Sequence, residues 1–316
     1  MELTKKFKQT NKNVQQKWWT PYAFILPSFL VIFFIIFLPL IFEFMMAMFD
    51  IRLQNIRLLK NVGINIFNFP KIMKEYFIAL GNYVEILKDR LFYRTFVRTV
   101  IWTFTNVFFH VVIGVWLAIL LNRKLPFKSI FRVLLILPWA MPQYIAAITW
   151  KGMFNYEFGA INLILHYLGI EKINWLGDPT YTLIAAIIAN IWLGVPFMMM
   201  VALGGLQSIP HDLYESSDID GASGWQKFKH VTLPLLKPVM VPAIILGTVW
   251  TFNMLNIIYI MKDGLPGDDV NILITKMYRD GFDLYRYGYA AALSVIIFVI
   301  LTLFSLVYLK ANENRE

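Results

Sequence analysis

The chain contains no cysteine and few charged residues. Among its 316 residues the absence of Cys excludes disulfides, iron–sulfur clusters and thiolate metal sites. Only 16% of the residues are Asp, Glu, Lys or Arg, whereas 58% are hydrophobic and the mean hydropathy is +0.59. A soluble α-helical protein of this size could not hide so much apolar side-chain surface. The composition therefore indicates a protein embedded in a lipid bilayer.

Sequence motifs of enzyme chemistry are also missing. The chain has no G-x-x-x-x-G-K-[ST] phosphate-binding loop, no H-E-x-x-H metal motif and no G-x-S-x-G nucleophile motif. We therefore predict that it neither hydrolyses ATP nor performs covalent catalysis, and that it holds no metal or cofactor of its own. The net charge of +9 is spread over loops between apolar runs, which favours contact with anionic membrane lipid over nucleic acid.

Long apolar runs dominate what is present. Six of them are long enough to cross about 30 Å of hydrocarbon, and they cover residues 22–49, 96–121, 133–154, 181–206, 239–261 and 287–309. A cleaved signal peptide is the alternative for the N-terminus, but the first run is far longer than the roughly 7–15 apolar residues of such a signal. We predict an all-α integral membrane protein with six transmembrane helices. A single domain, 22–309, lies between an N-terminal segment, 1–21, and a tail, 310–316.

Positive side chains predict the orientation of this domain. The short segments on the side of the N-terminus are basic, with Lys5, Lys6, Lys8, Lys12, Lys17, Arg123, Lys124, Lys128, Arg132, Lys227, Lys229 and Lys237. The short loop 155–180 on the opposite side carries only Lys172. The segment 50–95 on that side also carries basic residues, but long segments weigh little in the positive-inside rule. Both termini and the polar loop 207–237 are therefore predicted to be cytoplasmic.

The polar loop 207–237 is predicted to form a helical hairpin. Ser208 is a candidate cap for its first helix, and Gly221 permits the positive φ that would end that helix. Ser223 is suited to cap the second helix, which Pro234 and Pro238 are expected to stop. Such a hairpin would be a rigid element that a partner outside the membrane can grip.

The same loop carries a family resemblance. Seven positions resemble the EAA loop, E-A-A-x3-G-x9-I-x-L-P, of permease subunits in binding-protein-dependent ABC importers: Glu215, Ser216, Ser217, Gly221, Val231, Leu233 and Pro234. The two Ala positions are Ser and the Ile position is Val. The resemblance implies a type I ABC importer permease fold and a hairpin that docks on an ATPase. It assigns ATPase coupling to Glu215, Ser216, Ser217, Asp220, Gly221, Ala222, Leu233 and Pro234.

Polar residues inside spans four and five form a second candidate site. In span four, Pro196 removes a backbone hydrogen bond and Gly194 exposes backbone, so we predict a kink at mid-membrane. Asn190 on that span, with Trp250 and Thr251 on span five, could offer hydrogen bonds and an aromatic face to a neutral sugar. The alternative is that each polar group simply bonds to a neighbouring helix or to its own backbone.

A closer resemblance favours the sugar interpretation. The motif N-x-W-L-G-x-P-aromatic, followed by L-Q-S-I-P and the EAA-like loop, is similar to the maltose-type first permease subfamily. The resemblance implies sugar contacts at Asn190, Leu193, Gly194, Phe197, Gly247, Trp250 and Thr251. This chain departs from the subfamily at three of these positions: a Tyr is replaced by Phe197, a Ser by Gly247 and an Asn by Thr251.

The resemblance also implies an assembly. Its expected parts are a second homologous permease subunit, two cytoplasmic ATP-binding subunits that hold the ATP and magnesium, and an extracytoplasmic sugar-binding protein. The expected substrate is a malto-oligosaccharide or related oligosaccharide, and the expected location is a bacterial inner membrane. ATP-driven closure of the ATPases would move the hairpin and reorient the spans around the sugar, as alternating access requires.

Two other classes of function are weighed against this one. An ion-coupled secondary transporter would need coupling-ion groups or inverted repeats, and a membrane enzyme would need acids, bases or metal ligands inside the spans. Asn106 and His110, one turn apart on span two, could be imagined as a proton relay. No carboxylate is evident beside them, so we predict a contact between helices instead.

Overall fold

The computed structural model describes residues 19–54, 74–264 and 266–313. All regular elements in these ranges are helical, and the only β pairing among them consists of two isolated bridges, Phe49 to Phe77 and Arg52 to Arg286. The all-α prediction is thus confirmed for the described residues. Most of the predicted N-terminal segment, part of the segment 50–95 and the end of the tail lie outside them.

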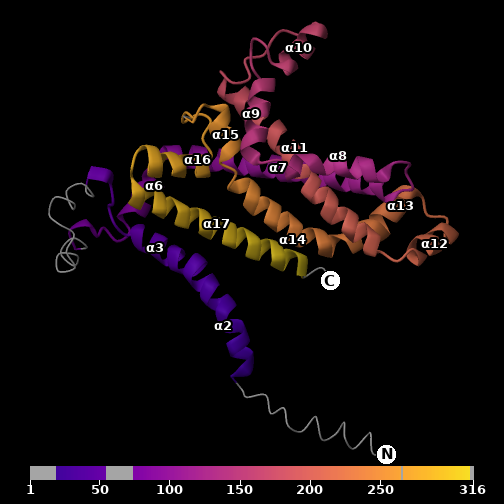
Figure 1. The fold of residues 1–316 in the computed structure, drawn as a ribbon, viewed down its shortest axis with the longest axis horizontal. Helices are drawn as coiled ribbons and strands as arrows, with labels where there is room; N and C mark the ends of the chain where they lie inside the picture. The colour runs from indigo at the N-terminus through magenta and orange to yellow at the C-terminus, as the bar shows by residue number, and fades with distance from the viewer. Residues whose placement is uncertain (1–18, 55–73, 265, 314–316) are drawn as a thin grey trace, which may run out of the picture.

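The long helices form the body of the molecule (Figure 1). They are α2 (Thr20–Ile32), joined through a π-helical turn (Phe33–Phe37) to α3 (Leu38–Met46), and α7 (Arg90–Asn122), α11 (Pro179–Ser208), α14 (Leu233–Phe252) and α17 (Tyr287–Glu313). Shorter helices connect them: α6 (Gly81–Lys88), α8 (Lys128–Ala140), α9 (Gln143–Met153), α10 (Ala160–Tyr167), α12 (Asp212–Ile219), α13 (Gly224–Lys227), α15 (Asn256–Met261) and α16 (Leu273–Tyr278). Two further π-helical turns cover Phe228–Thr232 and Arg279–Asp283.

Five helical stretches of the described chain are long and apolar enough to cross a membrane, and the bent pair α8 and α9 makes a sixth if it crosses as one span. The predicted span 133–154 is therefore wrong as a single straight helix, because α8 and α9 meet at 95°. Met141 and Pro142 between them have extended backbones, with ψ of 142° and 127°. A residue before proline is disfavoured in the helical region, and the extended backbone of Met141 follows this preference.

The kink predicted in span four does not interrupt the helix. α11 passes Pro196 as a single helix of 30 residues. Span five, in contrast, is interrupted between Phe252, where α14 ends, and Asn256, where α15 begins. Broken backbone therefore lies in spans three and five, one on each side of the unbroken α11.

Close packing of α7, α11 and α14 forms the core of the body. At Gly114 on α7, an added Cβ would lie 2.8 Å from the Met198 Cβ and 2.9 Å from the Met199 amide nitrogen, so only glycine allows α11 to approach this closely. The buried apolar cluster around this contact comprises Ala118, Leu121, Met198, Met199, Ala202, Leu203, Leu206, Leu236, Met240 and Ala243. This core holds α11 and α14 side by side.

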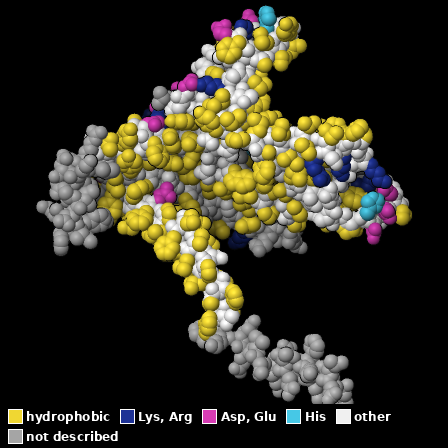
Figure 2. Space-filling model, in the orientation of Figure 1, with side chains coloured by type: hydrophobic (Ala, Val, Ile, Leu, Met, Phe, Trp, Pro, Cys, Tyr) yellow, Lys and Arg dark blue, Asp and Glu magenta, His cyan; other side chains and the backbone are white. Residues whose placement is uncertain are grey.

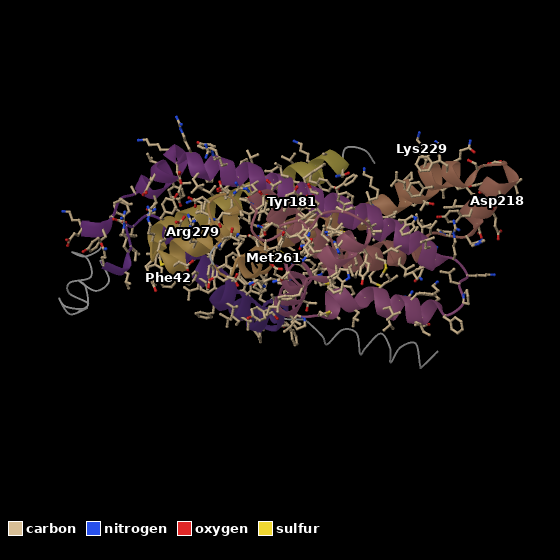
Figure 3. The ribbon with its side chains drawn as sticks, turned by 90° about the horizontal axis from the view of Figure 1, so that it is seen from above. Phe42, Tyr181, Asp218, Lys229, Met261 and Arg279 are labelled. Atoms are coloured by element: carbon tan, nitrogen blue, oxygen red, sulfur yellow. The ribbon has the colours of Figure 1, made fainter. Side chains whose placement is uncertain are left out.

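The two ends of the bundle differ. Figures 1 and 3 place the hairpin of α12 and α13, marked by Asp218 and Lys229, at one end, and Arg279 at the other. The C-terminal end of α17 lies at the hairpin end, where the Lys237 Nζ donates to the Asn312 carbonyl at 3.4 Å. Much of the surface between the two ends is apolar, and Lys and Arg gather near the hairpin (Figure 2).

The N-terminal helix stands apart from this bundle. α3 packs on α17, but α2 points away from the other helices (Figure 1). None of the side chains of α2, α3 or the turn between them is buried. This span is therefore held to the rest of the described chain only near its α3 end.

Candidate functional site: a polar hairpin and an intramembrane cavity

The hairpin has the predicted break at Gly221, whose φ is +74°. Ser223 caps α13 as predicted, because its Oγ accepts from the Gln226 amide while the Gln226 side chain accepts from the Ser223 amide. The prediction for Ser208 is wrong: it is the last residue of α11, and its Oγ donates to the Gly205 carbonyl. Since that hydroxyl is held by its own helix, it does not cap α12.

The second arm of the hairpin does not stop at Pro234 or Pro238, contrary to the prediction. Helix continues from Gly224 through the π-helical turn into α14 and on to Phe252, where α14 ends. A π-helical turn widens the helix just before Pro234, where a backbone hydrogen-bond donor is missing. The arm of the hairpin and the membrane span are therefore one continuous element.

Side chains within the hairpin lock its two arms together. Lys227 on α13 pairs with Asp218 on α12 at 2.6 Å, and the Tyr214 and Thr232 hydroxyls lie 2.9 Å apart. Sequence reasoning missed all four residues, since contacts between residues 9 and 18 positions apart depend on how the arms fold back. The hairpin therefore has the cross-links of a rigid body.

The predicted coupling residues divide between the tip and the base of this hairpin. Glu215 is exposed in the first turn of α12, and its Oε1 contacts the His211 Nδ1 at 3.0 Å. The Ser216 and Ser217 hydroxyls both donate to the Leu213 carbonyl and so are bonded within α12. Asp220, Gly221 and Ala222 form the turn at the tip, whereas Leu233 and Pro234 begin α14 at the base.

Two apolar side chains near the tip are also exposed. Ile219 is 88% exposed and Trp225 is 70% exposed. Apolar surface next to acidic groups is typical of a protein contact that is incomplete in one subunit alone. These residues could have been noticed as apolar positions in an otherwise polar loop.

The seven predicted sugar-contacting residues line one cavity of about 110 Å³. Four come from α11 and three from α14: Asn190, Leu193, Gly194, Phe197, Gly247, Trp250 and Thr251. The cavity also has lining residues to which sequence reasoning assigned no sugar contact. They come from α7, from the α8 and α9 break and its two sides, from α11, and from the break between α14 and α15: His110, Trp139, Met141, Gln143, Met198 and Met254. The structure thus brings the predicted set together.

Aromatic rings form one part of the cavity. The ring centroids of Phe197 and Trp250 lie 5.0 Å apart with a 60° angle between the rings, which fixes both side chains across the α11 and α14 contact. The Thr251 carbonyl accepts from the Trp102 indole nitrogen at 2.8 Å and ties α14 to α7. The apolar ring faces are thus held by helices that are themselves cross-linked.

Polar contacts at the back of the cavity explain why Gly194 is needed. The His110 Nε2 lies 3.0 Å from the Asn190 carbonyl, and the His110 side chain is buried. An added Cβ at Gly194 would lie 2.3 Å from two atoms of that ring. The contact confirms the predicted helix–helix contact for His110. For Asn106 the prediction is wrong, because its Nδ2 donates to the Trp102 carbonyl of its own helix.

Asn190 itself keeps an available donor. Its side chain is 1% exposed, and within the described residues its Nδ2 has no hydrogen-bond partner. A buried amide left unpaired costs about 1–3 kcal/mol, so a ligand group that accepts from it in the cavity would be favoured. No group of three or more His, Cys, Asp or Glu side chains in the described ranges is placed to hold a metal ion.

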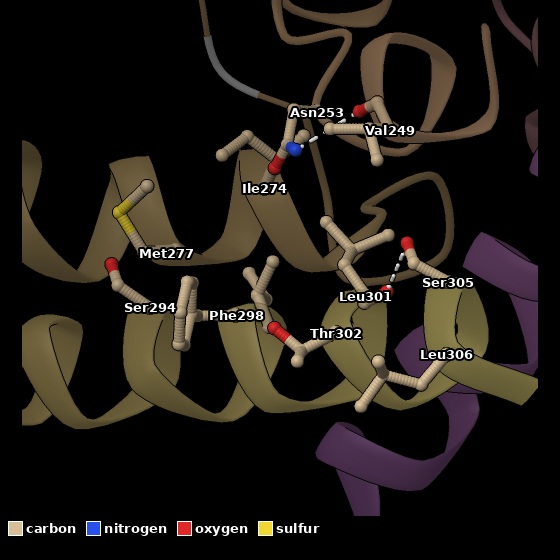
Figure 4. Close-up of a pocket in the computed structure, with 11 residues that line it drawn as sticks. Val249, Asn253, Ile274, Met277, Ser294, Phe298, Leu301, Thr302, Ser305 and Leu306 are labelled. Carbon is tan, nitrogen blue, oxygen red and sulfur yellow. Dashed lines mark hydrogen bonds between the residues drawn. The ribbon is translucent and has the colours of Figure 1, made fainter. Parts of the chain in front are cut away.

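A larger groove lies elsewhere, between α14, α16 and α17 (Figure 4). Its volume is about 460 Å³, and two of its polar side chains are bonded to carbonyls one turn earlier: the Asn253 Nδ2 donates to the Val249 carbonyl and the Ser305 Oγ to the Leu301 carbonyl. A third groove, of about 520 Å³ between α7, α14 and α17, is lined almost entirely by apolar side chains. Both grooves are larger than the cavity at Asn190. As a sugar site we favour the cavity, because it contains the unpaired Asn190 amide donor.

Known proteins share both the sequence and the fold of this chain. Residues 110–313, which include the hairpin and the α11 and α14 walls of the cavity, match the family described as the binding-protein-dependent transport system inner membrane component. The chain belongs to this family. It is therefore a multi-pass permease subunit of a membrane transporter and not itself an enzyme, and the two alternative classes of function have no support.

Individual relatives of this permease agree with the assignment. It is 41% identical to the trehalose/maltose transport system permease protein MalF of Thermococcus litoralis over 76% of this chain and 81% of that protein. It is 34% identical to the galactooligosaccharides transport system permease protein GanP of Bacillus subtilis over 88% of this chain and 66% of that one. A solved bacterial ABC transporter involved in the import of alginate has the same fold, with a TM-score of 0.76 at 21% identity over 99% of each chain.

Proposed function

We propose that this permease forms half of the translocation pathway of an ATP-driven importer for neutral oligosaccharides, malto-oligosaccharides or related sugars among them. The observation that carries the proposal is the cavity, which gathers all seven resemblance-assigned positions beside a buried, unpaired Asn190 amide. Aromatic faces with a few placed hydrogen bonds suit a sugar. Several relatives are permeases of maltodextrin and trehalose/maltose transport systems, which supports the same substrate class.

Transport by the complete complex tests this proposal. The permease is reconstituted with its partner permease, ATPases and binding protein, and uptake of maltose, trehalose, maltotriose and a galactooligosaccharide is measured in proteoliposomes. We expect at least one sugar to be taken up with ATP and to stimulate ATP hydrolysis. Uptake of none of them, by a complex that still hydrolyses ATP, would overturn the assignment of a sugar substrate.

We also propose the full topology: six spans, a transmembrane domain 22–309 with an outer segment 50–95, a cytoplasmic coupling loop 207–237, and both termini in the cytoplasm. The support is that the hairpin and the end of α17 lie at the same end of the bundle. Because the chain has no cysteine, single-cysteine variants report position cleanly. Tyr167→Cys should react with an impermeant maleimide on intact cells, and Ala222→Cys only after permeabilisation. The reverse pattern would invert the topology.

The hairpin is proposed to be the coupling element, docked on a cytoplasmic ATPase. Its cross-linked arms and the continuous helix from Gly224 to Phe252 support this role, because a push on α13 acts directly on the span that carries Trp250. Glu215, exposed on α12, is suited to meet a basic group of the ATPase.

A charge reversal tests the coupling role. Glu215→Lys should lower sugar uptake and sugar-stimulated ATP hydrolysis about tenfold or more, while membrane insertion persists. Glu157→Lys makes the same change of charge on the opposite side of the proposed membrane and serves as the control. Wild-type coupling in Glu215→Lys would remove this side chain from the ATPase contact.

The cavity also supports the proposed assembly with a second homologous permease. Its volume of about 110 Å³ is below the roughly 300–1,000 Å³ of most ligand pockets, so the partner permease is proposed to complete the site. Two ATP-binding subunits, which hold the ATP and magnesium, and an external sugar-binding protein complete the proposed importer. Mass determination of the purified complex tests this stoichiometry.

A further inference from the structure

One wall of the cavity comes from a part of the chain to which no sugar contact has been assigned. Trp139 near the end of α8 and Gln143 at the start of α9 both line the cavity, on either side of the break at Met141 and Pro142. The seven predicted residues all belong to α11 and α14. The broken span therefore supplies a separate wall of the cavity.

The seven predicted residues on α11 and α14 offer a sugar few hydrogen bonds by themselves. Of these seven residues, only Asn190, Trp250 and Thr251 have a polar group in the side chain. The other four are Leu193, Gly194, Phe197 and Gly247. Sugar hydroxyl groups that lose water in such a site need partners, or their desolvation opposes binding. A further donor on another wall would meet this need.

Gln143 has such a donor. Its Oε1 accepts from the Asn256 Nδ2 at 3.3 Å, a long contact, and within the described residues its own amide NH₂ makes no hydrogen bond. The bond fixes the orientation of the carboxamide, because its oxygen points to α15 and its nitrogen is left for another partner. Asn256 does not itself line the cavity. Gln143 is thus an oriented donor at the cavity.

Trp139 offers a flat apolar face beside this donor. Its side chain is 54% exposed, and none of the ring contacts among the described residues involves it. The two other tryptophans near the cavity differ: Trp250 packs on Phe197, and Trp102 uses its indole nitrogen on the Thr251 carbonyl. The Trp139 ring therefore has a free face on which a sugar ring can stack.

We propose that Gln143 and Trp139 are sugar-contacting residues of the permease, with Gln143 donating to one hydroxyl and so determining which sugars are accepted, and Trp139 stacking on a sugar ring. This inference rests on the proposed function and deepens it. It assigns specificity to the broken span as well as to α11 and α14.

The test pairs protein variants with altered sugars in the complete reconstituted importer. Gln143→Ala, Trp139→Ala and the control Tyr144→Ala, an exposed neighbour outside the cavity, are assayed with maltose, trehalose and the monodeoxy derivatives of each. Gln143→Ala should lower kcat/KM for a transported sugar about tenfold to hundredfold, as expected for one lost hydrogen bond. For the sugar derivative that lacks the contacted hydroxyl, Gln143→Ala should lower kcat/KM less than threefold.

Asn256→Ala tests whether Gln143 contacts the sugar or only connects α9 to α15. If Gln143 only ties α9 to α15, then Gln143→Ala and Asn256→Ala should have the same effect on every sugar, and that result would overturn the inference. We expect instead that Asn256→Ala keeps the ranking of the sugars. Trp139→Ala should lower uptake more than Trp139→Phe, and equal rates in both variants and the wild type would remove the stacking role.

Failure of the inference can be told apart from failure of the proposed function. If Asn190→Ala impairs sugar uptake while Gln143→Ala and Trp139→Ala leave it unchanged for all sugars, the sugar site stands on α11 and α14 and this inference is wrong. If no sugar is transported by the wild type, both are wrong. Assembly and basal ATP hydrolysis are measured for each variant, and Gln143→Asn, which keeps an amide, should recover part of the activity if the fold is intact.

Discussion

Gly194→Ala should destabilise the permease through a single contact. The new Cβ would lie 2.3 Å from the Cε1 and Nε2 of His110, whereas ordinary contact begins at 3.4 Å, so the ring must withdraw by about 1 Å. Such a shift would stretch the 3.0 Å contact of the His110 Nε2 with the Asn190 carbonyl beyond hydrogen-bond length. Overpacking costs about 1–3 kcal/mol, and the lost bond adds roughly 1 kcal/mol.

A second substitution should reverse this effect. His110→Ala removes the ring that the new methyl group meets, so Gly194→Ala should cost little when combined with it. The assay is the thermal unfolding midpoint of the purified complex for both single variants and the double variant. Gly204→Ala is the matched control, because it lies on the same helix and its added Cβ meets nothing within 4 Å. A Gly194→Ala permease as stable as Gly204→Ala, or no rescue by His110→Ala, would refute the reasoning.

Three further predictions concern transport and the hairpin. Gly221→Asp should reduce coupled uptake, because φ is +74° there and a side chain would strain the turn; unchanged uptake per ATP hydrolysed would contradict this. Asn190→Ala and Trp250→Ala should each lower sugar uptake about tenfold or more, while assembly and basal ATP hydrolysis persist. Phe197→Tyr should change sugar preference. Wild-type uptake kinetics in all three variants would show that these residues only pack between helices. Lys227→Ala should lower stability by less than about 1 kcal/mol, because Asp218 in that pair is largely exposed; a much larger loss in thermal unfolding would show that the pair is stronger than surface ion pairs generally are.

Local signals in the sequence predicted more of the site than of the helix geometry. The Gly221 turn and the Ser223 cap follow from conformational and hydrogen-bonding preferences of single residues, and both are present. Asn190 and Trp250 were placed together through the resemblance, and the cavity brings them together. A resemblance can assign such positions because it carries information about tertiary contacts that periodicity lacks.

Proline positions show where sequence reasoning fails. Pro142 breaks a span, whereas Pro196 and Pro238 lie inside continuous helices. Each proline lacks a backbone N–H, so this loss alone does not decide whether the helix continues, and contacts with surrounding helices contribute to the outcome. The apolar run 133–154 contains no sign of this difference. The length of an apolar run indicates whether it can cross the membrane, but not whether the helix bends within it. Likewise, the partner of His110 is a backbone carbonyl 80 positions away, which no local pattern indicates.

The N-terminal helix has a consequence for the life of the subunit in the cell. The 27 residues Thr20–Met46 bury no side chain in their own chain, so they contribute little to holding the single subunit together. Binding of a partner stabilises only the state that binds it, and the gain depends on the partner's concentration. A subunit made in excess of a partner that covers this helix would remain the less stable species and the preferred target of membrane proteases. Balanced synthesis of the subunits would then set how much of this protein accumulates.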